Sequence, residues 1–266
     1  MNLDLSGRVA LVTGGSKGIG RATAVTLARD GADVAICARG EGDLAATAEE
    51  VRSATGRRCL AVSADLSTLD GCQRFVRGAA EHFGRADILV CCANMHGAGG
   101  ATFTAIPDEQ WLYHFNVKFF SSVRCAREAI PHMQRDRWGR IILVSGMATR
   151  LVRLFATDNG PVCAALTNLA KQLAAQVIGD GIRVNVLHPD LTRTPLLTAL
   201  LSREARQRNV PVEQIEREHA ARAPLGRLLE PEEIANVVAY LCSAAADAIT
   251  GQSIAVDGGA APSVHY

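Results

Sequence analysis

Short apolar runs alternate with longer stretches of mixed polarity along the whole chain. Seven of these runs predict strands, at residues 8–13, 33–38, 58–64, 87–93, 140–145, 182–188 and 252–256. Runs such as VALV, DILV and IILV have no polar alternation, so both faces of these strands should be buried. The pattern is typical of a Rossmann-type, doubly wound α/β fold, with about seven parallel strands and helices on both faces of the sheet.

The stretches between the strands predict helices. From Ala164 to Val177, apolar residues recur at helical spacing, at positions 166, 169, 170, 173 and 177. The least apolar stretch, Ser202–Arg222, carries many charges and predicts a helical excursion over one end of the sheet. There is no internal repeat or linker-like break, so the pattern predicts a single domain over residues 1–266, with its core at about 5–259.

Composition narrows the functional classes. The 266 residues carry a formal net charge of +1, which removes the electrostatic case for nucleic acid or an anionic membrane as a partner. No apolar run is long enough to span a membrane, and the N-terminus lacks the apolar core of a signal peptide. We therefore expect a soluble, cytoplasmic protein that acts on a small molecule.

The eight cysteines predict neither a metal site nor a disulfide framework. No C-x-x-C spacing occurs, and the adjacent Cys91 and Cys92 alternate across a predicted strand. We expect reduced thiols that pack as small apolar residues, and no bound metal. Cys163 lacks a neighbouring cation that would make it a thiolate nucleophile, which favours a packed thiol there too.

The first predicted strand runs directly into a glycine-rich turn. The turn reads Thr13-Gly14-Gly15-Ser16-Lys17-Gly18-Ile19-Gly20 and is followed by a helical stretch. Glycines let the backbone turn sharply and bring its N–H groups against a pyrophosphate at the helix N-terminus. Because the turn joins the first strand to the first helix of a βαβ pattern, it predicts a dinucleotide-binding site rather than a plain loop.

The spacing T-G-x-x-x-G-x-G resembles that of the short-chain dehydrogenase/reductase family, and the resemblance extends from about Leu5 to Gly259. Other matching segments are Ala64-Asp65-Leu66, Asn116, GRII at 139–142, RVNV at 183–186, Thr194, PEEIA at 231–235, ITGQ at 249–252 and VDGG at 256–259. The resemblance implies that Asp65 meets the adenine of a nicotinamide cofactor. It further implies a cofactor site formed by Gly14, Ser16, Lys17, Gly18, Ile19, Gly20, Arg39, Asp65, Leu66, Ala93 and Thr194.

The end of the second predicted strand indicates which nucleotide is bound. In family members that bind NAD, an acid at this point holds the ribose hydroxyls, whereas here Ala38 is followed by Arg39. Arg39 can grip a 2′-phosphate with two parallel hydrogen bonds, and Lys17 adds a second cation on the same side. NADP(H) is therefore the predicted cofactor. The alternative is that Arg39 is a surface residue paired with Glu41 or Asp43.

The proton relay that the resemblance implies is missing. In the family a Ser polarises the carbonyl, a Tyr four residues before a Lys transfers the proton, and an Asn completes the set. Counting back from RVNV, the Tyr position falls on Asn159 and the Lys position on Cys163. Counting forward from GRII, the Ser position falls on Gly146, with Ser145 one residue early, so only Asn116 of the four is retained.

No shift of the alignment restores the relay. No tyrosine lies between Tyr113 and Tyr240, and Lys171 is two turns further along the helix. Lys118 lies two residues from Asn116, about 200° around the helix, and is expected to point away from the site. Tyr113 shares a face with Asn116, and it either looks into the site or packs at the surface.

Further departures lie near the expected nicotinamide site. Asn94 and Asp190 each replace a glycine of the family pattern; both residue types tolerate a left-handed backbone and can serve as turn substitutes. Alternatively, Asp190 supplies an acid/base pair with His188. Asp158 and Asn159 are polar candidates for contacts with the substrate.

Three functions are compatible with these features. The first is an NADP(H)-dependent oxidoreductase acting on an activated carbonyl, imine or enone, with the catalytic candidates Asn116, Ser145, Asn159, His188 and Asp190. The second is a redox-neutral lyase, dehydratase, isomerase or cyclase, and the third is a non-catalytic NADP(H)-binding partner protein. Surplus apolar positions on the helix after Asn159 and the terminal VDGG predict a homo-oligomer, a tetramer with two-fold axes.

Overall fold

The computed structural model describes residues 3–95, 101–152 and 157–262, which contain a seven-stranded parallel sheet. The strands are β1 (Val9–Thr13), β2 (Asp33–Ala38), β3 (Cys59–Ser63), β4 (Ile88–Cys91), β5 (Gly139–Val144), β6 (Ile182–Pro189) and β7 (Ser253–Val256). They pair in the order β3-β2-β1-β4-β5-β6-β7. The predicted doubly wound fold is confirmed, and so are all seven predicted strands, with ends that differ by at most two residues.

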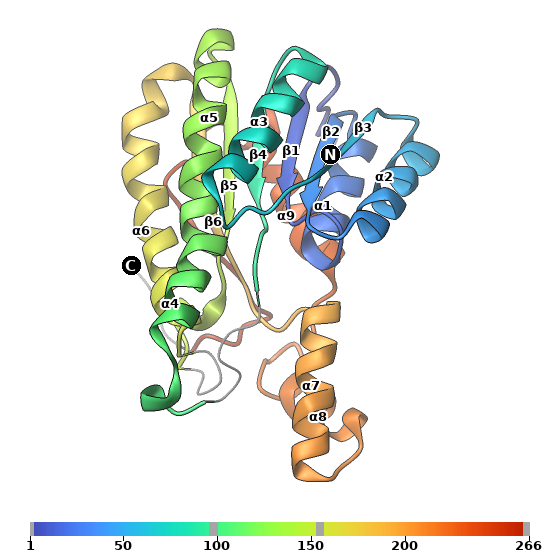
Figure 1. Cartoon of the computed structure of the whole chain (residues 1–266), viewed down its shortest axis with the longest axis vertical. Coiled ribbons are helices and arrows are strands. Elements are labelled where there is room, and N and C mark those ends of the chain that lie inside the picture. Colours follow the sequence, from blue (N-terminus) through green and yellow to red (C-terminus); the bar gives the residue numbers. More distant parts are fainter. Residues whose placement is uncertain (1–2, 96–100, 153–156, 263–266) are drawn as a thin grey trace.

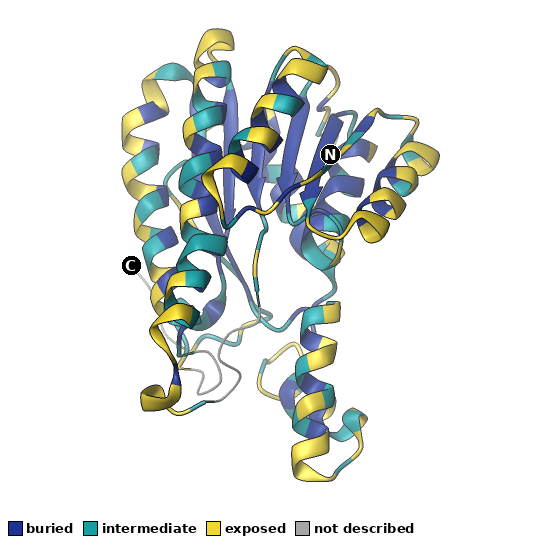
Figure 2. Ribbon diagram, in the orientation of Figure 1, coloured by how far each residue is buried: buried dark blue, intermediate teal, exposed yellow. Residues whose placement is uncertain are grey.

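Helices cover both faces of the sheet (Figure 1). On one face lie α1 (Gly18–Arg29), α2 (Glu41–Thr55) and α9 (Pro231–Cys242); on the other lie α3 (Leu69–Phe83), α5 (Ser121–Asp136) and α6 (Asn159–Val177). Successive strand residues enter different cores: Val12 packs toward the α1 side and Leu11 toward the α3 side. Figure 2 shows the consequence, a buried sheet between helices whose outer faces are exposed.

The strand order reverses between β1 and β4, and the ends of these two strands are tied together. The hydroxyl of Thr13 accepts hydrogen bonds from the backbone N–H groups of Cys92, at 3.0 Å, and of Ala93, at 3.1 Å. Because these N–H groups bond to a side chain instead of a neighbouring strand, β4 ends at Cys91, two residues before the predicted end. In parallel sheets, such a reversal at the carboxyl ends is where ligands bind.

One long helix crosses this end of the sheet. The short helix α4 (Asp108–His114) continues into the π-helix η2 (Phe115–Phe120) and then into α5. A π-helical turn is rare and is frequently found at functional sites. In the part of the chain that the structure describes, four single 3₁₀ turns complete the connections: η1 (Phe103–Ala105), η3 (Met147–Thr149), η4 (Ile178–Asp180) and η5 (Ala244–Ala246).

The predicted excursion at 202–222 is helical, but it forms two helices and begins earlier. These are α7 (Pro195–Arg208) and α8 (Val212–Ala220), which extend beyond the sheet in Figure 1. Thr194 caps α7 by accepting from the N–H of Leu197, and Pro195 is its first residue. The left-handed Asn209, with a φ of 52°, ends it.

Within the described ranges, no helix combines the length and apolar content needed to cross a bilayer.

Candidate active site

The glycine-rich turn between β1 and α1 is too tight to admit side chains. A Cβ atom on Gly20 would lie 2.2 Å from the backbone oxygen of Gly14, and one on Gly18 would lie 2.8 Å from Cγ2 of Thr194. Gly18 also has a φ of 54°, which favours glycine. The turn therefore offers bare backbone beside the first N–H groups of α1, which lack intrahelical partners. This arrangement fits the pyrophosphate of a dinucleotide.

Two basic residues lie near the end of β2. The exposed Arg39 donates from Nη1 to the hydroxyl of Tyr113 at 2.7 Å, and Lys17 forms a salt bridge with Asp43 at 2.7 Å. The carboxylate of Asp43 pairs with Lys17 and not with Arg39. The phenol of Tyr113 is neutral, so it does not neutralise the positive charge of Arg39. Tyr113 thus turns toward the end of β2.

The remaining predicted cofactor residues lie in the first turn of α1 or in loops after the strands. They are Ser16, Ile19, Asp65, Leu66, Ala93 and Thr194. Ala93 contacts the glycine turn, with its Cα 3.1 Å from where a Cβ on Gly14 would be, and Thr194 lies against Gly18. Asp65 is exposed, and its Oδ1 accepts from a backbone N–H two residues later at 2.9 Å. Loops from β3, β4 and β6 therefore gather on the side of the sheet where the turn lies.

A buried lysine meets the start of α6. Lys118, on η2, is 2% exposed, and its Nζ donates to the backbone oxygen of Ser145 at 3.0 Å and to Oδ1 of Asn159 at 3.4 Å. The same Oδ1 accepts from Sγ of Cys163 at 3.3 Å. The hydroxyl of Ser145 donates to the backbone oxygen of Cys163 at 3.1 Å. One hydrogen-bonded network, the Lys118 network, thus joins η2, the end of β5 and the first turn of α6.

The prediction that Lys118 points away from the site is wrong. Asn116 and Lys118 do lie on different faces of the helix, but it is Lys118 that reaches the start of α6, whereas Asn116 bonds to Arg124 further along the same long helix. Its Oδ1 accepts from Nη2 of Arg124 at 3.2 Å, and Arg124 also donates to the backbone oxygen of Ser67. The prediction that the two side chains point in different directions holds. What failed is its assumption that the Asn116 side of the helix faces the start of α6.

A buried histidine and aspartate lie beside the Lys118 network. Nδ1 of His114 lies 3.2 Å from Oδ2 of Asp158, which also accepts from Gln110 at 3.1 Å. Burial lowers the pKa of His114, and so does the positive charge of Lys118; the contact with Asp158 only partly offsets them. The ring is therefore neutral at neutral pH. Asp158, a sequence candidate for substrate contact, is fully buried against α4 instead.

His188 is a buried part of the sheet. Its Nε2 lies 2.8 Å from Oγ of Ser253, and its Nδ1 lies 3.2 Å from the backbone oxygen of Gly146 and 3.3 Å from Oγ1 of Thr149. Burial lowers the pKa of His188 to about 4, so the imidazole is neutral at neutral pH. Both ring nitrogens are engaged, and the hypothesised pairing with Asp190 is not formed.

Asn94 and Asp190 do not act as left-handed substitutes for glycine. Among the described residues other than glycine, only Arg137 and Asn209 have positive φ angles. That explanation of the two departures is therefore wrong. The N–H of Asp190 instead donates to the backbone oxygen of Val256 at 3.1 Å, which continues the pairing of β6 with β7 by one residue.

Comparison with known proteins agrees with this architecture. A family profile described as enoyl-(acyl carrier protein) reductase matches residues 14–261. The short-chain reductase protein NovJ of Streptomyces niveus is 32% identical over 251 residues, which cover 94% of this chain and 93% of the relative. This chain belongs to the short-chain dehydrogenase/reductase family.

Two further relatives show how fully this short-chain dehydrogenase/reductase matches its family. The cis-4-hydroxycyclohexanecarboxylate dehydrogenase of Sinomonas cyclohexanicum is 33% identical over 255 residues, covering 95% of this chain and 96% of the relative. The crystal structure of L-sorbose reductase from Gluconobacter frateurii, complexed with NADPH and L-sorbose, superposes with a TM-score of 0.95 at 32% identity. That match covers 99% of this chain and 100% of the other.

Sequence reasoning missed the role of Lys118 in joining the elements of the site. A signal was present, because Lys118 stands in the apolar segment FNVKFF and is one of only three lysines in the chain. A charged residue among bulky apolar ones is either exposed or buried with partners, and burial with partners often marks function. The side chain's direction could not be read without knowing which way Asn116 faces.

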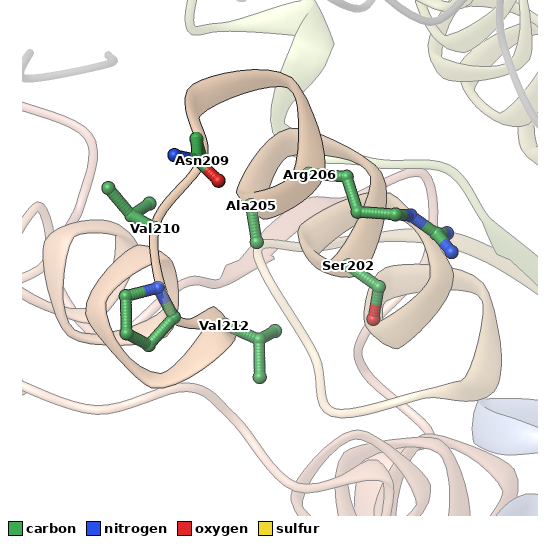
Figure 3. Close-up of a pocket in the computed structure, with 7 residues that line it drawn as sticks. Ser202, Ala205, Arg206, Asn209, Val210 and Val212 are labelled. Carbon is green, nitrogen blue, oxygen red and sulfur yellow. The ribbon is translucent and has the colours of Figure 1, made fainter.

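A surface hollow on the α7–α8 pair lies apart from these groups (Figure 3). It is lined by Ser202, Ala205, Arg206, Asn209, Val210, Pro211 and Val212. Arg206 is the one charged side chain among them, and none of the predicted site residues takes part. The chemistry of this protein is therefore to be sought at the strand ends rather than in this hollow.

All eight cysteines are free, and seven of them are buried. Burial raises the pKa of Cys37, Cys91 and Cys242 to about 12, so these thiols are protonated at neutral pH. Cys163 is buried in the Lys118 network, where its thiol bonds to Asn159. In the described ranges, no cluster of three or more His, Cys, Asp or Glu side chains is arranged to hold a metal ion.

Proposed function

We propose that this chain is an NADP(H)-dependent oxidoreductase that reduces an activated acceptor, such as a polarised enone, an imine or an activated carbonyl compound. The choice of acceptor rests on one observation: the side chain at the start of α6 that bonds to Lys118 is an amide, that of Asn159. Counting along the family pattern puts Asn159 at the position of the proton-donating Tyr. An amide can donate a hydrogen bond to a substrate oxygen, but it cannot release a proton to it.

The residues present suit NADP(H). The bare backbone of the turn around Gly14, Gly18 and Gly20 would hold the pyrophosphate, and Arg39 would bind the 2′-phosphate with Lys17 nearby. The related L-sorbose reductase, of nearly the same length and fold, was crystallised with NADPH. When bound, this cofactor supplies a hydride.

The contacts of three other catalytic candidates, Ser145, His188 and Asn116, argue against their replacing the missing acid. The hydroxyl of Ser145 donates to a backbone oxygen inside the protein, and His188 is neutral and fully buried. Asn116 bonds to Arg124 on another face of its helix. A positioned acid contributes typically ~10²–10⁴-fold to rate, so only an acceptor that does not need it should react well. When an enone accepts a hydride at its β-carbon, the C=C electrons shift toward the carbonyl carbon and the C=O electron pair moves onto oxygen. Water can then protonate the resulting enolate at its α-carbon.

The test compares acceptors under identical conditions. The protein is incubated with NADPH and, separately, a cyclic enone, a cyclic imine and the saturated ketone of the same ring size, while NADPH consumption is recorded. We expect the enone or imine to react at least ~10²-fold faster than the ketone. Equal rates for the ketone would contradict the proposal. Product without NADPH consumption would favour a redox-neutral enzyme, and tight NADPH binding without any turnover would favour a partner protein.

A further inference from the structure

We propose that Lys118 and Asn159 form an oxyanion-binding site, which takes the singly charged oxygen of an enolate or a phenolate. The site lies where η2, the end of β5 and the start of α6 meet. The inference rests on the proposed function only for the nature of the natural ligand. Binding of an anionic oxygen by these two residues can be measured without cofactor and without turnover.

The orientation of the Asn159 amide follows from its partners. An ammonium group has only donors, so the amide atom facing Nζ of Lys118 must be the oxygen. The thiol of Cys163 donates to the same oxygen. Both contacts hold Oδ1 on the protein side, which directs the two N–H donors of the amide elsewhere. Asn159 is only half-buried, so these donors can be reached by a ligand.

Lys118 is not paired directly with a carboxylate among the described residues. Both of its acceptors are neutral, namely a backbone oxygen and the amide of Asn159. Among the described residues, no carboxylate forms a salt bridge with Lys118. A buried ammonium that is bonded only to neutral acceptors is costly, and it gains most from a ligand that brings a negative charge to it. One of its three N–H donors has no acceptor in the described contacts, and it can donate to the oxygen of such a ligand.

The start of α6 adds a second feature that favours an anion. The first N–H groups of α6 begin at Asn159, and the N-terminus of a helix attracts anions. The neighbouring carboxylate, Asp158, accepts from Gln110 and lies against His114, on the α4 side. Burial lowers the pKa of His114 most, and the positive charge of Lys118 follows; the pKa of His188 is lowered mainly by burial, then by Arg150 and, least, by Lys118. The field of Lys118 therefore reaches both the α4 side and the end of β6.

The pair of Lys118 and Asn159 suits a ligand with one anionic oxygen better than it suits a phosphate. The ammonium and the amide lie 3.4 Å apart, and together they carry one positive charge and a small number of donors. A single oxygen with one negative charge can accept from both, as the oxygen of an enolate does after reduction of an enone. Donors aimed at developing charge in a buried site stabilise it more than water does.

The experiment uses 4-nitrophenol, whose phenol and phenolate forms absorb at different wavelengths. The full-length protein is titrated with this probe at several pH values, and the pKa of the bound probe is read from its spectrum. We expect the phenolate to bind preferentially and the pKa of the bound probe to fall. Lys118→Met should weaken phenolate binding at least tenfold, and Asn159→Asp should abolish it, because the new carboxylate would pair with Lys118 and repel the probe.

Controls separate the site from folding and from catalysis. Lys171→Met removes an exposed lysine of α6 and should leave phenolate binding unchanged. If Lys118→Met does not fold by circular dichroism, Asn159→Leu carries the test, since it removes the amide from a half-buried position. Absence of binding, or binding that ignores both residues, would overturn the inference. Phenolate binding without reduction of any acceptor would support this site and refute the proposed oxidoreductase function. Reduction of acceptors without phenolate binding would refute only the site.

Discussion

The starts of α1 and α6 lie at the same end of the sheet, but they are built in opposite ways. The start of α1 is bare backbone, where a Cβ on Gly20 would lie only 2.2 Å from a neighbouring oxygen. The start of α6 is lined by side chains, with Asn159, Cys163 and the buried Lys118 in one network. The first region depends on the absence of side chains, and the second depends on which side chains are present.

This difference bears on how each region can change in evolution. Adding a side chain at a tightly packed glycine of the turn, such as Gly18 or Gly20, alters the backbone itself, so the turn is either kept or lost. At the start of α6, substitutions change the chemistry and leave the backbone in place. Gly146 illustrates this, because a Cβ there would meet Sγ of Cys163 at an ordinary 3.6 Å. A protein can therefore keep the fold and the nucleotide turn of its family while its proton-handling groups change.

The largest effect is expected from rebuilding the family relay at the start of α6. Gly146→Ser, Asn159→Tyr and Cys163→Lys should be introduced together with Lys118→Met, because a lysine at 163 would otherwise meet a second buried ammonium. We expect reduction of a simple ketone to increase by ~10²–10⁴-fold, the usual contribution of a positioned acid. NADPH oxidation with the ketone measures it. Each substitution alone is the control and should achieve little, since a relay acts as a unit.

The glycine turn should respond in the opposite direction. Gly20→Ala forces a methyl group against the backbone of Gly14, which should destabilise the fold by about 3 kcal/mol or more and greatly weaken NADPH binding. Urea denaturation and fluorescence titration measure the two effects. Gly78→Ala is the matched control, because a Cβ there meets nothing within 4 Å; in the middle of α3 it should stabilise by ~0.4–1 kcal/mol. Normal NADPH binding by the Gly20 variant would refute the account of the turn.

A third prediction tests whether His188 belongs to the packed structure. Its pKa of about 4 in the folded protein lies below the 6.5 of a free imidazole, so the unfolded chain binds the proton first as pH falls. Stability linked to His188 is therefore complete above pH 6.5 and lost between pH 6.5 and 4, by about 3 kcal/mol. His188→Gln should flatten this part of the stability profile, measured by urea denaturation at several pH values. An unchanged slope would show that the ring is already charged or solvated.

The smallest effect concerns the nucleotide phosphate. Arg39→Ala should weaken NADPH binding by about ten- to a hundredfold, the range for a charged hydrogen bond, and should barely alter NADH binding. Calorimetric titration of both nucleotides measures the ratio. Tyr113→Phe is the control: it removes the present acceptor of Arg39 and keeps the cation, so NADPH should bind at least as well. Equal losses for NADPH and NADH would remove the case for a 2′-phosphate contact.

Much of the fold could be predicted from local sequence, and so could the glycine turn between β1 and α1. Mainly apolar runs identified the seven strands, even though Asn185 lies buried in β6 and the edge strands β3 and β7 are partly exposed. The excursion after β6 was placed correctly but too short, because the start of α7 depends on the cap at Thr194 and on Pro195. The end of β4 was missed because Thr13, far away in sequence, captures the next two N–H groups.

The sequence by itself determined the parallel sheet, the glycine turn and the absence of a Tyr and a Lys at the expected spacing. Those properties depend on residue identity and short-range periodicity. Only the tertiary structure decided that Lys118 faces Asn159, that His188 is bonded on both ring nitrogens, and that Arg39 meets Tyr113. Each of these contacts joins residues from different elements. Its existence depends on how the helices are rotated about their axes against the sheet, and packing of the whole domain fixes that rotation.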